Sequence, residues 1–131
     1  KEAKNYGLKL KAHAGEFGDA MSVLEVVEVL DLDEVQHGIA AVKSKDVIKF
    51  LKERGTRLNI CPTSNVVLGV VKNIKEHPLR KLFDEGVRVS VNTDDIMIFG
   101  QTLSDEYYNL FTAGLFSEKE IELLMESSIY D

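Results

Sequence analysis

Residues 89–95 read VSVNTDD, in which alternating valines run directly into an asparagine, a threonine and two aspartates. Three earlier segments have the same form, a strand-like run that ends in polar side chains: KAHAGE at 11–16, EVQHG at 34–38 and NICPTSN at 59–65. Proteins built from βα units keep their chemistry at the carboxyl ends of successive parallel strands. The four segments therefore predict one enzyme site at one edge of a parallel sheet.

The spacing of apolar residues predicts the elements between these segments. We expect strands at residues 8–12, 34–37, 57–61 and 87–91, and helices at 19–30, 44–54 and 78–85, with a looser stretch at 66–75. Two further helices are expected at 104–112 and from Ser117 onward, where Glu120 three residues later makes a capping box. Asp19 and Ser44 are the expected N-caps, and Gly55 is the expected helix stop.

The expected fold is α/β: four βα units with extra carboxyl-terminal helices, which is half of an eight-stranded (β/α)8 TIM barrel. A complete barrel typically needs about 250 residues, whereas this chain has 131 and enters a strand soon after Lys1. We therefore expect residues 1–131 to be a partial barrel domain, the carboxyl-terminal part of a longer protein. An open sheet would expose the interior faces of residues 8–12 and 87–91 to water.

Composition narrows the class of protein. Hydrophobic residues make up 44% of the chain, enough for one core, and the net charge of −6 comes with no Lys/Arg run. Nucleic acid is therefore an unexpected partner. Apolar stretches are too short to span a bilayer, and no signal segment is evident. A single cysteine, Cys61, cannot form an intrachain disulfide, which favours a cytoplasmic location.

The first two polar clusters carry histidines. Ala14 and Gly15 separate His13 from Glu16, and this small pair lets the backbone turn so that both side chains face one cavity. The alternative is an exposed turn with an incidental histidine. His37 is suited to proton transfer near neutral pH, although a lone histidine is more often structural.

The last two clusters carry a thiol, at Cys61, and two carboxylates, at Asp94 and Asp95. Adjacent carboxylates at Asp94 and Asp95 need a metal, a basic substrate nitrogen or hydrogen-bond donors, and the alternative is a turn or an N-cap. Cys61 is expected to be a buried thiol, while Ser64 or Asn65 ties the loop by backbone hydrogen bonds. His77, just before Pro78, is expected on the surface.

The four motifs together resemble the adenosine deaminase family of zinc aminohydrolases: HAGE at 13–16, HG at 37–38, CPTSN at 61–65 and NTDD at 92–95. The resemblance implies strands five to eight of a (β/α)8 barrel that converts adenosine to inosine and ammonia. It also implies that His13 and Asp94 bind zinc. Zinc usually takes at least three protein ligands, and two further histidines are expected from a missing amino-terminal half.

The resemblance implies roles for the remaining site residues. Glu16 would protonate the purine ring, and His37 would orient and deprotonate the zinc-bound water. Asp95 would hydrogen-bond the purine, and Gly15 would approach the substrate through its backbone. Ile96 departs from the family, which usually has proline there, as does the Val-Gln pair at 35–36.

Several functions stay open. Adenosine is the leading substrate, and adenine or AMP deamination on the same scaffold is the nearest alternative. A different class is a non-catalytic half-barrel that serves as an interaction module. We expect the chain by itself to be inactive and to self-associate, to pair with the missing half or to fold poorly.

Overall fold

The computed structural model describes residues 2–129, which form a four-stranded sheet with the spatial order β1-β2-β3-β4. The strands are β1 (Lys11–Ala14), β2 (Glu34–His37), β3 (Arg57–Ile60) and β4 (Val89–Val91). Every neighbouring pair is parallel. The carboxyl ends of all four strands therefore meet at one edge, as the sequence predicted.

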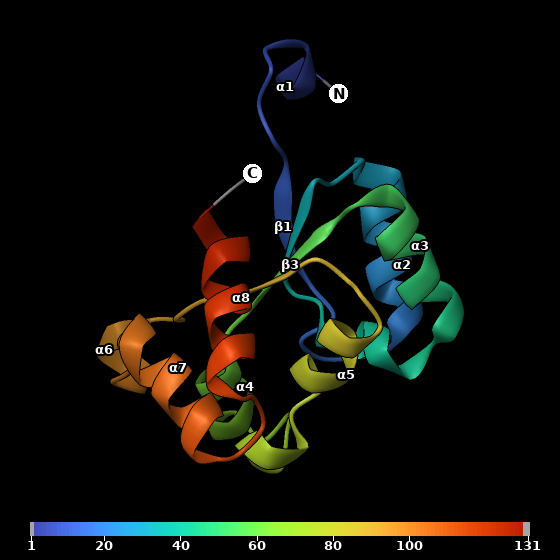
Figure 1. Cartoon of the computed structure of the whole chain (residues 1–131). Helices are drawn as coiled ribbons and strands as arrows, with labels where there is room; N and C mark the ends of the chain where they lie inside the picture. The colour runs from blue at the N-terminus through green and yellow to red at the C-terminus, as the bar shows by residue number, and fades with distance from the viewer. Residues whose placement is uncertain (1, 130–131) are drawn as a thin grey trace.

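Helices connect the strands and form the carboxyl-terminal third of the chain. Their bounds are α1 (Glu2–Asn5), α2 (Ala20–Leu30), η1 (Ile39–Lys43), α3 (Lys45–Arg54), α4 (Pro62–Val67), η2 (Ile74–Glu76), α5 (Leu79–Asp84), α6 (Ile96–Phe99), α7 (Leu103–Thr112) and α8 (Glu118–Ile129). In Figure 1 the strands lie between α2 and α3 on one side and α8 on the other. Over residues 2–129, no helix has the length and apolar character needed to cross a bilayer.

Local capping signals set the ends of the middle helices as expected. The side chain of Asp19 accepts a hydrogen bond from the backbone N–H of Ser22 at the start of α2, and Ser44 caps α3 in the same way. Gly55 ends α3 in the left-handed conformation, with φ of 71°. Glu120 accepts hydrogen bonds from both the backbone N–H and the hydroxyl of Ser117 at the start of α8.

The core lies between the sheet and its helices. It combines apolar side chains of the strands with those of α2, α3, α5, α7 and α8, among them Val23, Val27, Val35, Leu51, Leu58, Ile60, Leu82, Leu110 and Leu124. Each of these side chains is essentially removed from water. Burial of a Val or Leu side chain contributes about 1.5–3 kcal/mol, so this core holds the helices that carry the site loops.

Three strands differ from their predicted bounds, and the first of them is shifted to Lys11–Ala14. The first begins at Lys11 rather than at residue 8, because the backbone N–H of Leu10 donates to the side chain of Asp33 and the ladder with β2 starts at the next residue. Leu8 is 60% exposed and takes no part in the sheet. The fourth strand covers Val89–Val91 and the third ends at Ile60. The second matches its predicted bounds.

The structure contains helical segments that were not predicted. The expected loose stretch at 66–75 overlaps α4, which begins at Pro62 directly after β3, and η2 follows it. Proline at the first helical position is a start signal, because its missing N–H is not needed there. The α7 helix covers Leu103–Thr112, which confirms the helix expected from about Ser104 to Thr112, and Thr102 and Asp105 form its capping box; α6 was not predicted.

Helix α8 covers the fourth strand. Val89 and Val91 are buried, and the hydroxyl of Ser127 donates to the backbone carbonyl of Val89. The prediction that the face of residues 87–91 meets water was therefore wrong. Strand β1 is different: its side chains alternate between exposed and half-buried, so it forms the more open side of the sheet.

Candidate active site

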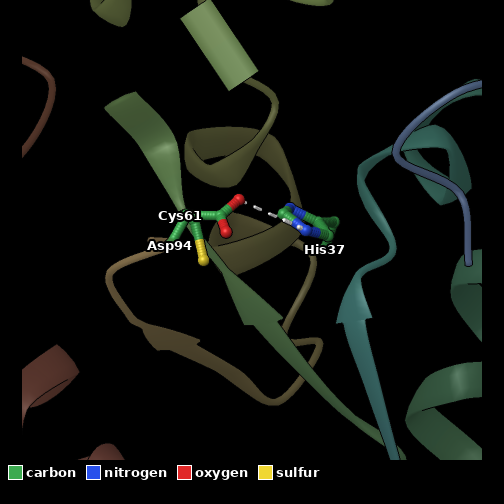
Figure 2. A group of neighbouring side chains, drawn as sticks. All are labelled: His37, Cys61 and Asp94. Carbon is green, nitrogen blue, oxygen red and sulfur yellow. Dashed lines mark ion pairs between the residues drawn. The ribbon is translucent and has the colours of Figure 1, made fainter. Parts of the chain in front are cut away.

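Side chains from three strand ends meet at the carboxyl edge of the sheet. Figure 2 shows the carboxylate of Asp94 directed at the ring of His37, with the thiol of Cys61 beside the carboxylate. One possible metal-ligand atom from each of these residues lies within 4.8 Å of the other two. Strand ends β2, β3 and β4 thus build one cluster, at the edge that the sequence predicted.

His37 lies between two carboxylates. Its Nδ1 is 3.5 Å from Oε1 of Glu16, and its Nε2 is 3.9 Å from Oδ2 of Asp94. Burial lowers the pKa of His37, while the charges of Glu16 and Asp94 oppose that change and His13 reinforces it. His37 also has φ of 65°, a left-handed conformation that is strained for a residue with a side chain. Such strain is concentrated at functional sites.

The loop after β1 supplies the next residues. His13 is exposed and lies within β1 itself, with its ring centroid 5.5 Å from that of His37. Gly15 has φ of 64°, and a Cβ added there would lie 2.2 Å from Cγ2 of Val23. Glycine is therefore required both for the turn and for the space, and the turn carries Glu16 toward His37.

The two aspartates after β4 have different surroundings. Oδ1 of Asp94 accepts from the backbone N–H of Asp95 at 2.9 Å, while its other oxygen faces His37. Oδ1 of Asp95 accepts from the backbone N–H groups of Met97 and Ile98, so Asp95 is the N-cap of α6. Both Asp95 bonds use Oδ1, so a substrate contact through Oδ2 is compatible with the cap.

Asn65 on α4 joins three site residues, and its side chain is fully buried. Its Nδ2 donates to Oε1 of Glu16 at 2.9 Å and lies 3.2 Å from Nδ1 of His37. Its Oδ1 lies 3.3 Å from Nε2 of His77. The prediction that Ser64 or Asn65 ties the loop to the backbone is confirmed for Ser64, whose hydroxyl donates to the carbonyl of Cys61 at 3.1 Å, whereas the side chain of Asn65 connects the site.

His77 was predicted on the surface, and this was wrong: the residue is 2% exposed. Its Nδ1 accepts a hydrogen bond from the backbone N–H of Leu79 at 3.0 Å, at the start of α5. Burial lowers the pKa of His77 to about 4, so the ring is neutral near pH 7. A histidine before Pro78 is held in an extended conformation, which aims its ring back at α4.

Glu106 on α7 is a further buried acid that sequence reasoning missed. It is 1% exposed, and burial raises its pKa, against the hydrogen bonds from Thr63 that lower it. The prediction that Cys61 is a buried thiol is confirmed. Burial raises the pKa of Cys61 to about 12, so the thiol is protonated near neutral pH.

The donor set fits a zinc ion. Zinc in proteins takes imidazole nitrogen at about 2.0–2.1 Å and carboxylate oxygen at about 2.0–2.2 Å, so two ligands of one ion lie within roughly 4 Å of each other. Asp94 offers the carboxylate, and Nε2 of His37 lies 3.9 Å from its Oδ2, so His37 faces the point where an ion bound to Asp94 would lie. His13 adds an imidazole beside His37, with ring centroids 5.5 Å apart, and Cys61 is the third member of the group with His37 and Asp94.

Comparisons with known proteins agree on one family. A family model described as adenosine deaminase matches residues 1–130. A Treponema pallidum protein provisionally named adenosine/adenine deaminase is 49% identical over 95% of this chain and 42% of its own length. An adenosine deaminase of Clostridium acetobutylicum is 39% identical over 97% of the chain, and an adenine deaminase of Rhizobium rhizogenes 40% identical over the same share. The chain spans about two fifths of the length of these relatives.

Solved structures are similar over nearly the whole chain. The crystal structure of an adenine deaminase from Arthrobacter aurescens matches 99% of this chain and 41% of its own, with a TM-score of 0.89 and 34% identity. An amidohydrolase from Burkholderia ambifaria with bound zinc matches 96% of this chain and 36% of its own, with a TM-score of 0.85 and 28% identity. The likeness confirms the prediction of βα units from a TIM barrel.

Proposed function

Because the chain belongs to the adenosine deaminase family, we propose that it supplies the carboxyl-terminal half of a zinc-dependent (β/α)8 enzyme that deaminates a purine. In this reaction water adds to the ring carbon that carries the amino group, and the amino group leaves as ammonia. The placement of His37 between the carboxyl groups of Glu16 and Asp94 carries the proposal. This placement brings together the proposed proton donor Glu16, the imidazole of His37 and the proposed metal-binding carboxylate of Asp94.

The metal would be held by His13 and Asp94, with two further histidines from the remainder of the barrel. When bound there, zinc supplies Lewis-acid activation of the attacking water. The chemistry of the site supports this assignment, because imidazole and carboxylate groups from separate strands converge at one edge of the sheet.

Glu16 would protonate the ring nitrogen next to the attacked carbon. Such a donor must be a neutral carboxyl group when the substrate is bound, and a site closed to water favours that state. Glu16 is half-buried and receives a hydrogen bond from Asn65, which holds one carboxyl oxygen in place. The second oxygen can then present a proton to the purine.

The other site residues would orient the reactants. His37 would direct the attacking water from its Nε2 side, which faces Asp94. Asp95 would hydrogen-bond the purine through the oxygen that does not cap α6. Gly15, whose backbone turns sharply beside Val23, would let the main chain approach the substrate.

Adenosine is our first candidate substrate, and adenine is the second. The Clostridium relative named adenosine deaminase supports the nucleoside. The relatives and the Arthrobacter structure named adenine deaminase favour the free base. Contacts to a ribose would lie largely in the other half of the barrel, so the described residues favour neither.

Assay of the complete zinc-loaded protein with adenosine, adenine and AMP tests the proposal. We expect release of ammonia from adenosine or adenine, abolished by a zinc chelator and restored by added zinc. Turnover of AMP in preference to both would change the substrate assignment. Absence of ammonia from all three would favour the alternative, a non-catalytic interaction module.

A further inference from the structure

A buried chain of hydrogen bonds runs from the start of α5 into the site, and none of the roles above uses its outer half. It passes from the backbone N–H of Leu79 to His77, then to Asn65, and from there to Glu16 and His37. His77 and Asn65 are both buried, so water cannot replace either partner at low cost. A neutral buried histidine in such a position has one ring nitrogen that donates and one that accepts.

The donor and acceptor in each hydrogen bond of this series follow from the first bond, which the backbone N–H of Leu79 makes to His77. A backbone N–H can only donate, so Nδ1 of His77 is the acceptor and the ring proton lies on Nε2. That Nε2–H donates to the side-chain oxygen of Asn65. The amide orientation of Asn65 is thereby fixed, because its oxygen faces His77 and its nitrogen faces the site.

The side-chain nitrogen of Asn65, Nδ2, then contacts two site residues, Glu16 and His37. It donates to Oε1 of Glu16 at 2.9 Å and lies 3.2 Å from Nδ1 of His37, and because an amide NH2 can only donate, that Nδ1 is the acceptor. Since Nδ1 of His37 accepts, the proton of the neutral ring lies on Nε2, the nitrogen that faces Asp94. In this tautomer His37 orients an attacking water by donation, whereas taking a proton at Nε2 would require the other tautomer.

We propose that His77 is a positioning residue for the reaction: through Asn65 it fixes the carboxyl group of Glu16 and selects the Nε2–H tautomer of His37. This rests on the proposed function for its catalytic consequence, but the tautomers themselves are properties of the folded site. The low pKa of His77, about 4 because of burial, agrees with a ring that stays neutral while the site works near pH 7.

We call the hydrogen-bonded series from Leu79 through His77 and Asn65 to Glu16 and His37 the relay. Two substitutions of His77 distinguish a role in the relay from a role in packing alone. In His77→Gln the side-chain NH2 lies near the position of Nε2 and keeps the donor to Asn65, but the acceptor for Leu79 is lost. In His77→Asn the side-chain oxygen lies near the position of Nδ1 and keeps the bond from Leu79, but the donor to Asn65 is lost. Both remove the ring, and Asn is one methylene shorter than Gln, so the thermal stability of each variant is measured beside its kinetics.

In the complete zinc-loaded protein we expect His77→Asn to lower kcat about tenfold or more, with KM changed less than about threefold. His77→Gln should retain kcat within about threefold of the parent. Equal losses in the two variants, in proportion to their loss of thermal stability, would reduce His77 to a packing residue. Unchanged kcat in His77→Asn would also overturn the proposal.

Nitrogen NMR of the complete protein labelled at histidine provides a readout that does not depend on turnover. We expect His77 and His37 both to carry the proton on Nε2 at neutral pH, and His37 to become a mixture of tautomers in His77→Asn but not in His77→Gln. A proton on Nδ1 of His77, or a His37 signal indifferent to the Asn substitution, would refute the relay. The expected spectra in a protein that deaminates no purine would support the relay and reject the proposed function.

Discussion

The carboxylate of Glu106 on α7 accepts hydrogen bonds from both the backbone N–H and the hydroxyl of Thr63, at 3.1 and 2.9 Å. Thr63 lies in the first turn of α4, where backbone N–H groups have no partner within the helix and a negative charge is favourable. A carboxyl-terminal helix thus anchors the start of α4, the helix that carries Asn65 into the site. Thr63 and Glu106 are 43 residues apart in the sequence, so sequence reasoning did not predict this contact.

Glu106→Ala is expected to lower the free energy of unfolding by about 1–3 kcal/mol, because it leaves the donors of Thr63 without their acceptor. Glu106→Gln should lower it less, since both bonds use Oε2 and an amide oxygen at that position can still accept them. Urea denaturation measures both variants. Glu122→Ala, at an exposed position of α8, is the control and should stay within about 0.5 kcal/mol of the parent. An equal effect of Glu106→Ala and Glu122→Ala would contradict the anchoring role.

Local signals explain why much of the fold was predictable. Ser44 and Gly55 mark the ends of α3 by their own chemistry, and the alternating valines of β4 lead straight to Asp94. His77 and Glu106 were missed because their burial depends on residues of another segment, α4: Asn65 contacts His77, and Thr63 contacts Glu106. A polar residue shows no local sign of being buried until its partner is known.

Asp94→Ala and Asp95→Ala should separate metal binding from substrate binding in the complete protein. We expect Asp94→Ala to lower both zinc content and turnover, whereas Asp95→Ala should spare zinc and weaken substrate binding by about tenfold or more. Asp95→Ser keeps a capping oxygen for α6, so any loss that remains reports on the substrate alone. Metal analysis with steady-state kinetics makes the comparison, and dependence of zinc content on Asp95 but not on Asp94 would reverse the assignment.

Glu16→Gln should remove roughly 10²–10⁴-fold of the turnover while zinc content stays unchanged. The amide oxygen of glutamine can still accept the hydrogen bond from Asn65, so the loop should keep its shape and the proton donor alone is lost. Glu28→Gln, on the exposed side of α2, is the matched control. Activity of Glu16→Gln equal to that of Glu28→Gln would exclude Glu16 as the proton donor.

The buried ring of His77 predicts a loss of stability at mildly acidic pH. Its pKa is about 4 in the folded protein, against an ordinary value of 6.5, so the unfolded chain binds the proton first as the pH falls. The stabilisation is complete above pH 6.5 and is lost as the pH falls from 6.5 toward 4, by about 2 kcal/mol at pH 5. Denaturation at pH 7 and pH 5 measures this loss in the parent and in His77→Gln. The difference between the two pH values should shrink by that amount in the variant, and an unchanged difference would assign the acid sensitivity to other groups.

This chain by itself should not deaminate adenosine, since His13 and Asp94 are its two expected zinc ligands and the barrel needs its other half. Strand β1 is the open side of the sheet, and apolar side chains remain exposed, including Leu8 before β1 at 60% and Met97 on α6 at 93%. An open strand edge beside such surface favours pairing with another chain. We therefore expect the purified chain to self-associate, to pair with the amino-terminal half or to fold poorly, whereas the cover of α8 over β4 limits the exposure to one side. Sedimentation combined with a deaminase assay decides the matter, and a stable monomer that turns over adenosine would show that the chain needs no second half.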